Sequence, residues 1–130
     1  MFEISLRFLN KKRYYFMIKD KKTILIDLDG VLNIYNGHYD KDTIPDIKEG
    51  AEDFLEYLNR NSNLYLFTTR NLLKTAKWLI KNNLDRYFID ITNTKIPAYL
   101  YIDDRAICFK GDYEQTKQEI KKFKTYWKKL

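Results

Sequence analysis

Pairs of acidic residues follow two short apolar runs of this 130-residue chain. Asp27 and Asp29 stand two residues apart, so on an extended backbone their side chains point the same way. Asp103 and Asp104 follow the later run. Carboxylates that approach one another repel unless a cation neutralises them, and a cluster of hard oxygen ligands suits Mg²⁺. We therefore predict that these four aspartates surround one magnesium ion.

The same residue types fit the transfer of a phosphoryl group. A magnesium ion held by few carboxylates takes further oxygen ligands from its substrate, typically from a phosphate. Asp27 could attack phosphorus and form an aspartyl-phosphate, while Asp29 could protonate the leaving oxygen and then activate water. Positive and hydroxyl groups must also hold the phosphoryl oxygens. The candidates for that role are Thr68, Thr69, Lys95 and Arg70.

The segments that carry these residues have the pattern of buried strands. Short β-rich runs without clean alternation are typical of strands covered on both faces, as in a parallel sheet under helices. Such runs occupy residues 23–27, 64–67, 87–91 and 99–102. In such a sheet, ligands bind at the carboxyl ends of the strands, which is where the candidate residues lie.

Helical patterns separate the predicted strands. An apolar stripe over residues 49–59 uses Ala51, Phe54, Leu55 and Leu58. Asn71 can cap a helix that carries Leu72, Ala76, Leu79 and Ile80. Asp112 can cap a last helix, with Gln115 three residues on, and the expected inner face is Tyr113, Ile120 and Phe123. Strands that alternate with helices predict a single α/β domain over residues 1–130 with a mainly parallel sheet.

The motifs resemble those of the haloacid dehalogenase-like (HAD) superfamily. Residues 27–32 read DLDGVL, similar to the family signature DxDGxL after an apolar strand. Residues 64–68 read LYLFT, similar to the second motif. Lys95 fits the third motif, and residues 101–104, YIDD, fit the fourth. The resemblance covers roughly residues 23–109. Residues 94–98, TKIPA, followed by residues 101–106, YIDDRA, further resemble a subgroup of small bacterial and phage hydrolases of this type.

The resemblance implies a Rossmann-like three-layer core and a role for each matched residue. Asp27 is expected to be the nucleophile and, with Asp103, a direct Mg²⁺ ligand. Asp29 is expected to be the general acid and base, with its carbonyl oxygen on the metal, and Asp104 to support the metal. The phosphate-holding positions of the family fall on Thr68 and Lys95, although Thr69 stands beside the first of them.

The resemblance further implies an enzyme without a cap domain. Residues 33–46, with Asn36-Gly37 and Pro45, are too few to fold as a cap. An open site suits a large substrate or closure by another copy in a homo-oligomer. The expected substrates are a phosphorylated small molecule, a nucleotide or a nucleic-acid end.

The charge balance leaves a second class of function open. There are 24 basic and 18 acidic residues, a net charge of +6, which favours anionic partners. The alternative is therefore a basic nucleic-acid-binding module with a relic or regulatory metal site. The plainer explanation is a lysine-rich tail, residues 117–129, that solvates a helix. Transfer of phosphate to an acceptor other than water also fits the same residues.

The remaining features carry smaller expectations. Residues 2–8 alternate as a strand does, and Met17 could be a natural start, which would make residues 1–16 an extension. No apolar run is long enough for a membrane helix, and the start lacks a secretory pattern. The single cysteine, Cys108, predicts a reducing cytoplasm and a buried filler.

We expect His38 to be an exposed loop residue. Arg70 is as apt to pair with a carboxylate as to bind substrate, whereas Arg105 is expected to pair with an acid or to cap its loop.

Overall fold

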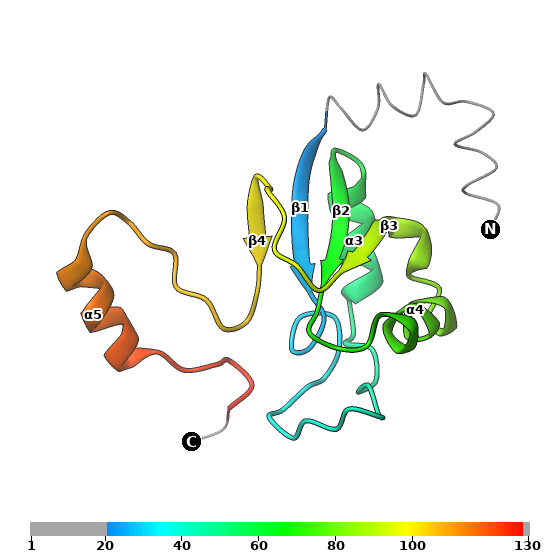
Figure 1. Cartoon of the computed structure of the whole chain (residues 1–130), viewed down its shortest axis with the longest axis horizontal. Helices are drawn as coiled ribbons and strands as arrows, with labels where there is room; N and C mark the ends of the chain where they lie inside the picture. Colours follow the sequence, from blue (N-terminus) through cyan, green and yellow to red (C-terminus); the bar gives the residue numbers. More distant parts are fainter. Residues whose placement is uncertain (1–20, 129–130) are drawn as a thin grey trace.

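The computed structural model describes residues 21–128 and has a parallel sheet of four strands at its centre (Figure 1). The strands are β1 (Lys22–Asp27), β2 (Ser62–Phe67), β3 (Phe88–Thr92) and β4 (Leu100–Ile102). Each overlaps one of the four predicted apolar runs, so the predicted α/β class with a parallel sheet is confirmed. Residues 2–8, where a further strand is predicted, lie outside the described residues.

The strand order brings separate parts of the chain together at one edge. The order is β3-β2-β1-β4, and β1 is parallel to both of its neighbours. In the register, Asp27 is opposite Phe67 of β2, and Ile26 is opposite Ile102 of β4. The residues that follow β2 and β4 therefore emerge on either side of Asp27.

Helix α3 (Ala51–Asn59) packs against β2 through one apolar face. Ala51 and Leu55 are buried, and Leu58 is partly buried against the core. The sheet contributes alternate residues to the same core, with Ile26 of β1 and Leu66 of β2 fully buried side by side. The predicted stripe is confirmed except at Phe54, which remains exposed.

Helix α4 (Leu72–Lys81) begins at the predicted cap, since Asn71 accepts a hydrogen bond from the backbone N–H of Lys74. Its buried face differs from the predicted one: Leu79 is buried, but Leu72 and Ile80 are exposed. The helix turns Thr75 and Trp78 inward instead. The Trp78 indole donates to the Pro45 carbonyl at 3.1 Å, so a polar anchor helps set the face. A 3₁₀ turn, η1 (Asp85–Tyr87), then leads into β3.

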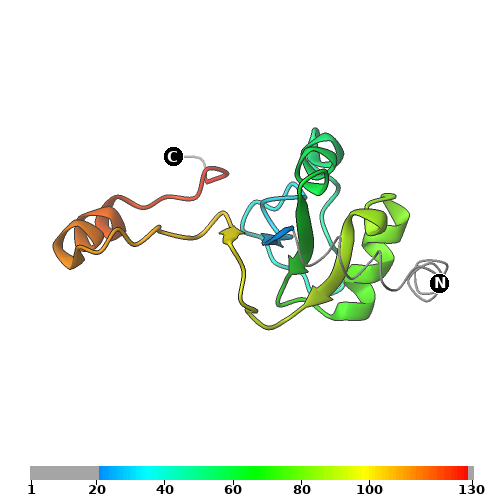
Figure 2. The ribbon, with the colours of Figure 1, turned by 90° about the horizontal axis from the view of Figure 1, so that it is seen from above.

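Helix α5 (Tyr113–Lys122) lies apart from the sheet, beyond β4 (Figures 1 and 2). Its predicted cap is confirmed, because Asp112 accepts a hydrogen bond from the Gln115 N–H at 3.1 Å. The predicted inner face is wrong: no residue of α5 is buried, and Tyr113 and Ile120 are 77% and 60% exposed. Residues 103–112 run outward without helix or strand and carry the helix away from the core. Cys108 lies on this stretch and is exposed, contrary to the prediction.

Residues 33–46 form a loop that is closed at its base. The N–H of Ile34 donates to the Asp46 carbonyl at 3.0 Å, and the N–H of Lys48 donates to the Leu32 carbonyl at 2.8 Å. Asn33 and Ile47 form an isolated antiparallel bridge at the same point. The loop therefore starts and ends beside the residues that follow β1. Across residues 21–128, the helices are all too short or too polar to cross a membrane.

Candidate functional site

Three aspartates meet at the carboxyl edge of the sheet. Asp27 ends β1, and Asp103 and Asp104 follow β4 directly. One carboxylate oxygen from each lies within 4.8 Å of the others. This spacing would allow a single cation to contact all three residues, and the donors are the hard oxygens that Mg²⁺ prefers. Of the four predicted metal ligands, the side chain of Asp29 is the one outside this group.

Burial and the neighbouring carboxyl groups raise the pKa of Asp27. Burial raises the pKa of Asp27, and so do the charge of Asp103 and a hydrogen bond to Asp104, from the ordinary value of 3.8 to about 8. A backbone hydrogen bond at Leu28 opposes this rise. In the absence of a cation, Asp27 therefore holds a proton at neutral pH and shares it with Asp104. Within residues 21–128, no lysine or arginine side chain forms an ion pair with Asp27, Asp103 or Asp104.

We expect the pH dependence of stability to report this shared proton. The native state keeps the Asp27 proton up to about pH 8, whereas the unfolded chain loses it near pH 4, so the contribution of Asp27 to stability is full below pH 4, falls as pH rises from about 4 to about 8, and is lost above that. Urea unfolding in a chelator should therefore show that the free energy of unfolding of the native chain falls relative to that of Asp27→Asn as pH rises from about 4 to about 8. Parallel pH profiles for the two proteins would contradict the shared proton.

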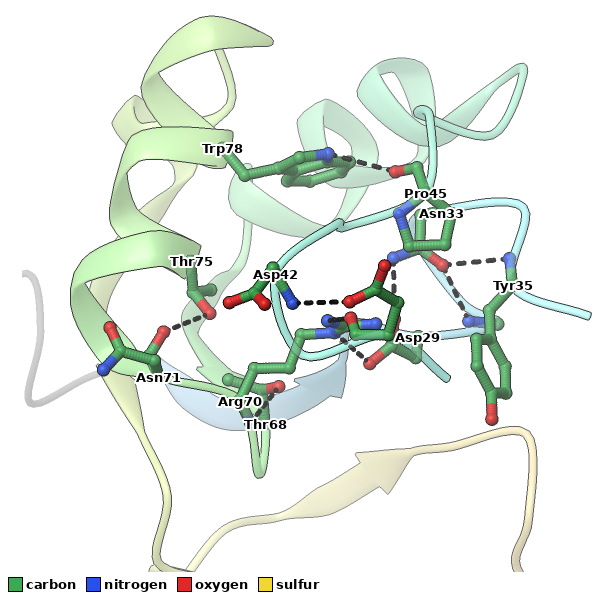
Figure 3. A network of polar contacts seen from close by, with 12 residues as sticks. Asp29, Asn33, Tyr35, Asp42, Pro45, Thr68, Arg70, Asn71, Thr75 and Trp78 are labelled. Carbon is green, nitrogen blue, oxygen red and sulfur yellow. Dashed lines mark hydrogen bonds and ion pairs between the residues drawn. The ribbon is translucent and has the colours of Figure 1, made fainter. Parts of the chain in front are cut away.

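Asp29 is held by two side chains that reach it from different parts of the chain (Figure 3). Arg70 donates from Nε to Oδ2 at 2.7 Å, and Asn33 donates from Nδ2 to Oδ1 at 3.0 Å. Asn33 is itself fixed, because its Oδ1 accepts from the N–H groups of Gly30 and Tyr35, both at 3.1 Å. The direction of the Asp29 carboxylate is therefore set on both sides. The sequence had not singled out Asn33, although asparagine after a tight turn commonly bonds to nearby backbone in this way.

Arg70 is a buried support rather than part of the cavity wall. Its side chain is 2% exposed and pairs with Asp29, which is the carboxylate pairing predicted as one alternative. Nη1 also donates to the Asp40 carbonyl at 2.8 Å, and the Tyr39 ring lies 4.6 Å from the guanidinium carbon. Arg70 thus ties β2, Asp29 and the loop of residues 33–46 together.

A cavity of about 540 Å³ contains the reactive groups. Its walls include Asp27, Asp29, Thr68 and Thr69, together with Asp103 and Asp104. Thr68 is buried, and its Oγ1 accepts a hydrogen bond from the Arg70 N–H at 3.1 Å, which leaves the hydroxyl proton free to be donated. Thr69 is exposed at the rim. Both threonines are placed where they could reach a ligand at Asp27.

Lys95 lies in an adjoining cavity of about 620 Å³. That cavity shares Asp27, Phe67 and Asp103 with the first, but Lys95 does not line the first. The ammonium group of Lys95 stands 4.4 Å from the centre of the Tyr101 ring, in a cation–π contact. The structure therefore brings Lys95 to the neighbourhood of Asp27 and holds it beside an aromatic ring.

The C-terminal segment returns to the site, a feature that the sequence did not reveal. The Trp127 indole donates to Asp104 Oδ2 at 2.5 Å, and the Tyr126 hydroxyl donates to the Gly30 carbonyl. The Trp127 ring also meets Tyr35 edge-on, with ring centres 5.4 Å apart. No local pattern marks such a return, because its partners lie from 23 residues (Asp104) to 96 residues (Gly30) earlier in the chain. Asp104 is consequently oriented by a group outside the predicted motifs.

His38 and Arg105 are the remaining residues for which the sequence gave an expectation. His38 is exposed, as expected. The Asp103 side chain caps the turn after β4, because its Oδ1 accepts from the backbone N–H of Arg105 at 2.8 Å. The Arg105 side chain forms no ion pair with an acid within residues 21–128, although such a pair is one of its two predicted roles. Its side chain instead reaches the Tyr35 hydroxyl at 3.3 Å.

Gly30 offers a direct test of how closely these segments pack. Its φ is +82°, and a Cβ placed there would lie 2.1 Å from Asp104 Oδ2. Gly30→Ala should therefore lose about 1–2 kcal/mol from the left-handed backbone alone, and more from the displaced carboxylate. Gly50→Ala is the matched control, since Gly50 has a φ of +86° with nothing within 4 Å. Urea unfolding of the two variants should show a larger loss for Gly30→Ala; equal losses would mean that the contact with Asp104 has no energetic weight.

Comparisons of the chain with protein-family models, with curated proteins and with solved structures gave no match. The arrangement of side chains in the cavity is therefore the basis for assigning a function.

Proposed function

We propose that this protein is a magnesium-dependent phosphohydrolase of the HAD-like type that acts through an aspartyl-phosphate on Asp27. The observation that carries the proposal is the meeting of Asp27, Asp103 and Asp104 in a cavity that also contains Asp29 and Thr68. The order of the sequence motifs supports the same assignment. The parallel sheet, with Asp27 on a central strand, supports a Rossmann-like core of this family.

The carboxylate cluster fits a magnesium ion. Three carboxylate oxygens within 4.8 Å of one another are suitable hard ligands, and Asp27 takes up a proton at neutral pH when no cation balances the charge. Asp27, Asp103 and Asp104 would hold the ion. When bound, Mg²⁺ would neutralise the negative charge shared by these carboxylates and a phosphate group.

In the proposed reaction, Asp27 and Asp29 divide the chemistry. An oxygen of Asp27 attacks phosphorus, the bond from phosphorus to the leaving oxygen breaks, and Asp29 gives that oxygen a proton. Asp29 then takes a proton from a water molecule, whose oxygen attacks the aspartyl-phosphate. The second step releases inorganic phosphate and restores the Asp27 carboxylate and the Asp29 proton.

Other residues position the reacting groups. Thr68 can donate its hydroxyl proton to a phosphoryl oxygen, since it lines the cavity and its oxygen is already held by the Arg70 N–H. Arg70 and Asn33 act through Asp29, whose carboxylate they orient. Lys95 would supply positive charge from the adjoining cavity, which opens beside Asp27.

A direct test is the release of phosphate from a generic aryl phosphate by the purified protein. Turnover should require Mg²⁺ and should stop when a chelator is added. A protein that releases no phosphate from aryl or alkyl phosphates at any Mg²⁺ concentration would exclude the proposed activity.

A further inference from the structure

A second cavity of about 570 Å³ opens beside the candidate active site. It lies between the loop of residues 35–38 and the C-terminal residues 123–128. Tyr35 and Arg105 line both this cavity and the one that contains Asp27. A ligand with a phosphate at Asp27 could therefore extend past these two side chains into the second cavity.

The walls of the second cavity combine aromatic rings with positive charge. Tyr35, Phe123 and Trp127 supply the rings. The basic groups are Arg105, Lys124 and Lys128, and no aspartate or glutamate lines this cavity. None of the three forms an ion pair with a carboxylate within residues 21–128. Their charge is thus available to an anionic ligand.

The aromatic groups are held in place before any ligand enters. Trp127 is fixed by its hydrogen bond to Asp104 and by its edge-on contact with Tyr35. The Arg105 guanidinium lies 5.3 Å from the Trp127 ring and 5.5 Å from the Tyr35 ring. Rings and guanidinium planes that are fixed beside a phosphate site are the groups on which nucleic-acid bases stack, and nearby lysines suit the backbone phosphates.

We infer that the second cavity binds the nucleoside part of the substrate, so that the enzyme removes a terminal phosphate from a nucleotide. This inference rests on the proposed function, which places the scissile phosphate at Asp27. The base stacks among Tyr35, Phe123 and Trp127, and Lys124 and Lys128 contact any further phosphate. The nucleotide could be free or could be the end of a nucleic-acid strand, since both present a base and a phosphate.

Kinetics with a charge-neutralised variant tests the inference. The native enzyme should have a higher kcat/KM for nucleoside monophosphates or for 3′- or 5′-phosphorylated oligonucleotides than for glycerol phosphate. Lys124→Gln/Lys128→Gln should lower kcat/KM by about tenfold for a phosphorylated oligonucleotide, whose further phosphates reach these lysines, which is the worth of two surface ion pairs. The kcat/KM for glycerol phosphate, which has no second phosphate, should be unaffected. The matched control is Lys121→Gln/Lys122→Gln on α5, which removes the same charge outside the cavity and should change neither value.

Comparing oligonucleotide with mononucleotide substrates distinguishes the end of a nucleic-acid strand from a free nucleotide. If kcat/KM is higher for oligonucleotides than for mononucleotides and this difference shrinks as salt is added, the substrate is the end of a nucleic-acid strand. If kcat/KM is equal or higher for mononucleotides, the substrate is a free nucleotide. Turnover of glycerol phosphate without any nucleotide preference, together with no effect of Lys124→Gln/Lys128→Gln, would overturn the inference and leave the proposed phosphatase standing.

Binding provides a readout that does not depend on turnover. Trp127 lies in the second cavity, whereas Trp78 is buried with its indole bonded to Pro45, so ligand-dependent changes of emission should come from Trp127. A nucleoside monophosphate should quench the emission of Asp27→Asn at concentrations at which inorganic phosphate does not. Nucleotide quenching of Asp27→Asn, combined with no phosphatase activity in the native protein, would reject the proposed function alone. Absence of nucleotide quenching would reject the second cavity as a nucleotide site.

Discussion

Replacement of Asp27 by asparagine is expected to reduce Mg²⁺-dependent phosphate release to the background rate. An amide is not a nucleophile towards phosphorus, so no aspartyl-phosphate can form. The variant should fold normally, because asparagine has nearly the same shape and removes a carboxyl group that burial and the charge of Asp103 disfavour as an anion. Colorimetric phosphate release and circular dichroism would measure the two properties on the same sample.

A matched control separates the role of Asp27 from a general loss of negative charge. Asp90 is an exposed acid on β3 and does not line the cavity. Asp90→Asn should keep the native rate. If Asp27→Asn also kept a near-native rate, the covalent mechanism would be wrong.

Asp29→Asn is expected to slow turnover by about 10²–10⁴-fold, the usual contribution of a positioned general acid and base. The loss should be greater for an alkyl phosphate than for a nitrophenyl phosphate in the first step, because a nitrophenolate leaves without a proton. Single-turnover rates with the two substrates would measure this difference, which a merely misfolded site would not produce.

A control must separate a catalytic role of Asp29 from the structural effect of losing its ion pair with buried Arg70. Asp42→Asn removes an acid of the loop of residues 33–46, which pairs with Lys74 at 2.6 Å on the exposed surface and lies outside the cavity wall. We expect Asp42→Asn to be fully active. Equal losses on both substrates, with a lowered unfolding midpoint, would indicate that Asp29 acts only through Arg70.

The strands could be predicted because their signal is local. Runs such as residues 23–27 and 64–67 are apolar and β-branched or aromatic over a short stretch, and the structure places a strand at each. Parallel pairing followed from the alternation with helices. It also explained why Asp27 and Asp103, 76 residues apart in the sequence, meet at one edge. The caps at Asn71 and Asp112 are local in the same sense and were predicted correctly.

The positions of the helices relative to the core depend on contacts that no local pattern contains. The stripe of Tyr113, Ile120 and Phe123 predicts a buried face, yet the outward path of residues 103–112 leaves it exposed. In α4, the anchor between Trp78 and Pro45 accompanies a rotation of the buried face away from Leu72 and Ile80.

The site shows the same division between local and long-range signals. The acids at the strand ends could be named from the sequence, since they directly follow apolar runs. Asn33 and Trp127 could not, because their importance comes from the partners they reach, Asp29 and Asp104. Arg70 could be named, but its two possible roles could be separated only by finding it buried against Asp29.

Residues 105–127 leave the sheet, form α5 and return to the site, and this path has a practical consequence for protein engineering. Both of its ends meet beside Tyr35, while α5 in its middle buries no residue. A reporter or affinity domain grafted into α5 would therefore sit clear of the sheet, whereas a truncation that removes Trp127 would remove the indole that orients Asp104. Helix α5 should therefore tolerate an inserted domain, whereas Tyr126 and Trp127 should not tolerate removal.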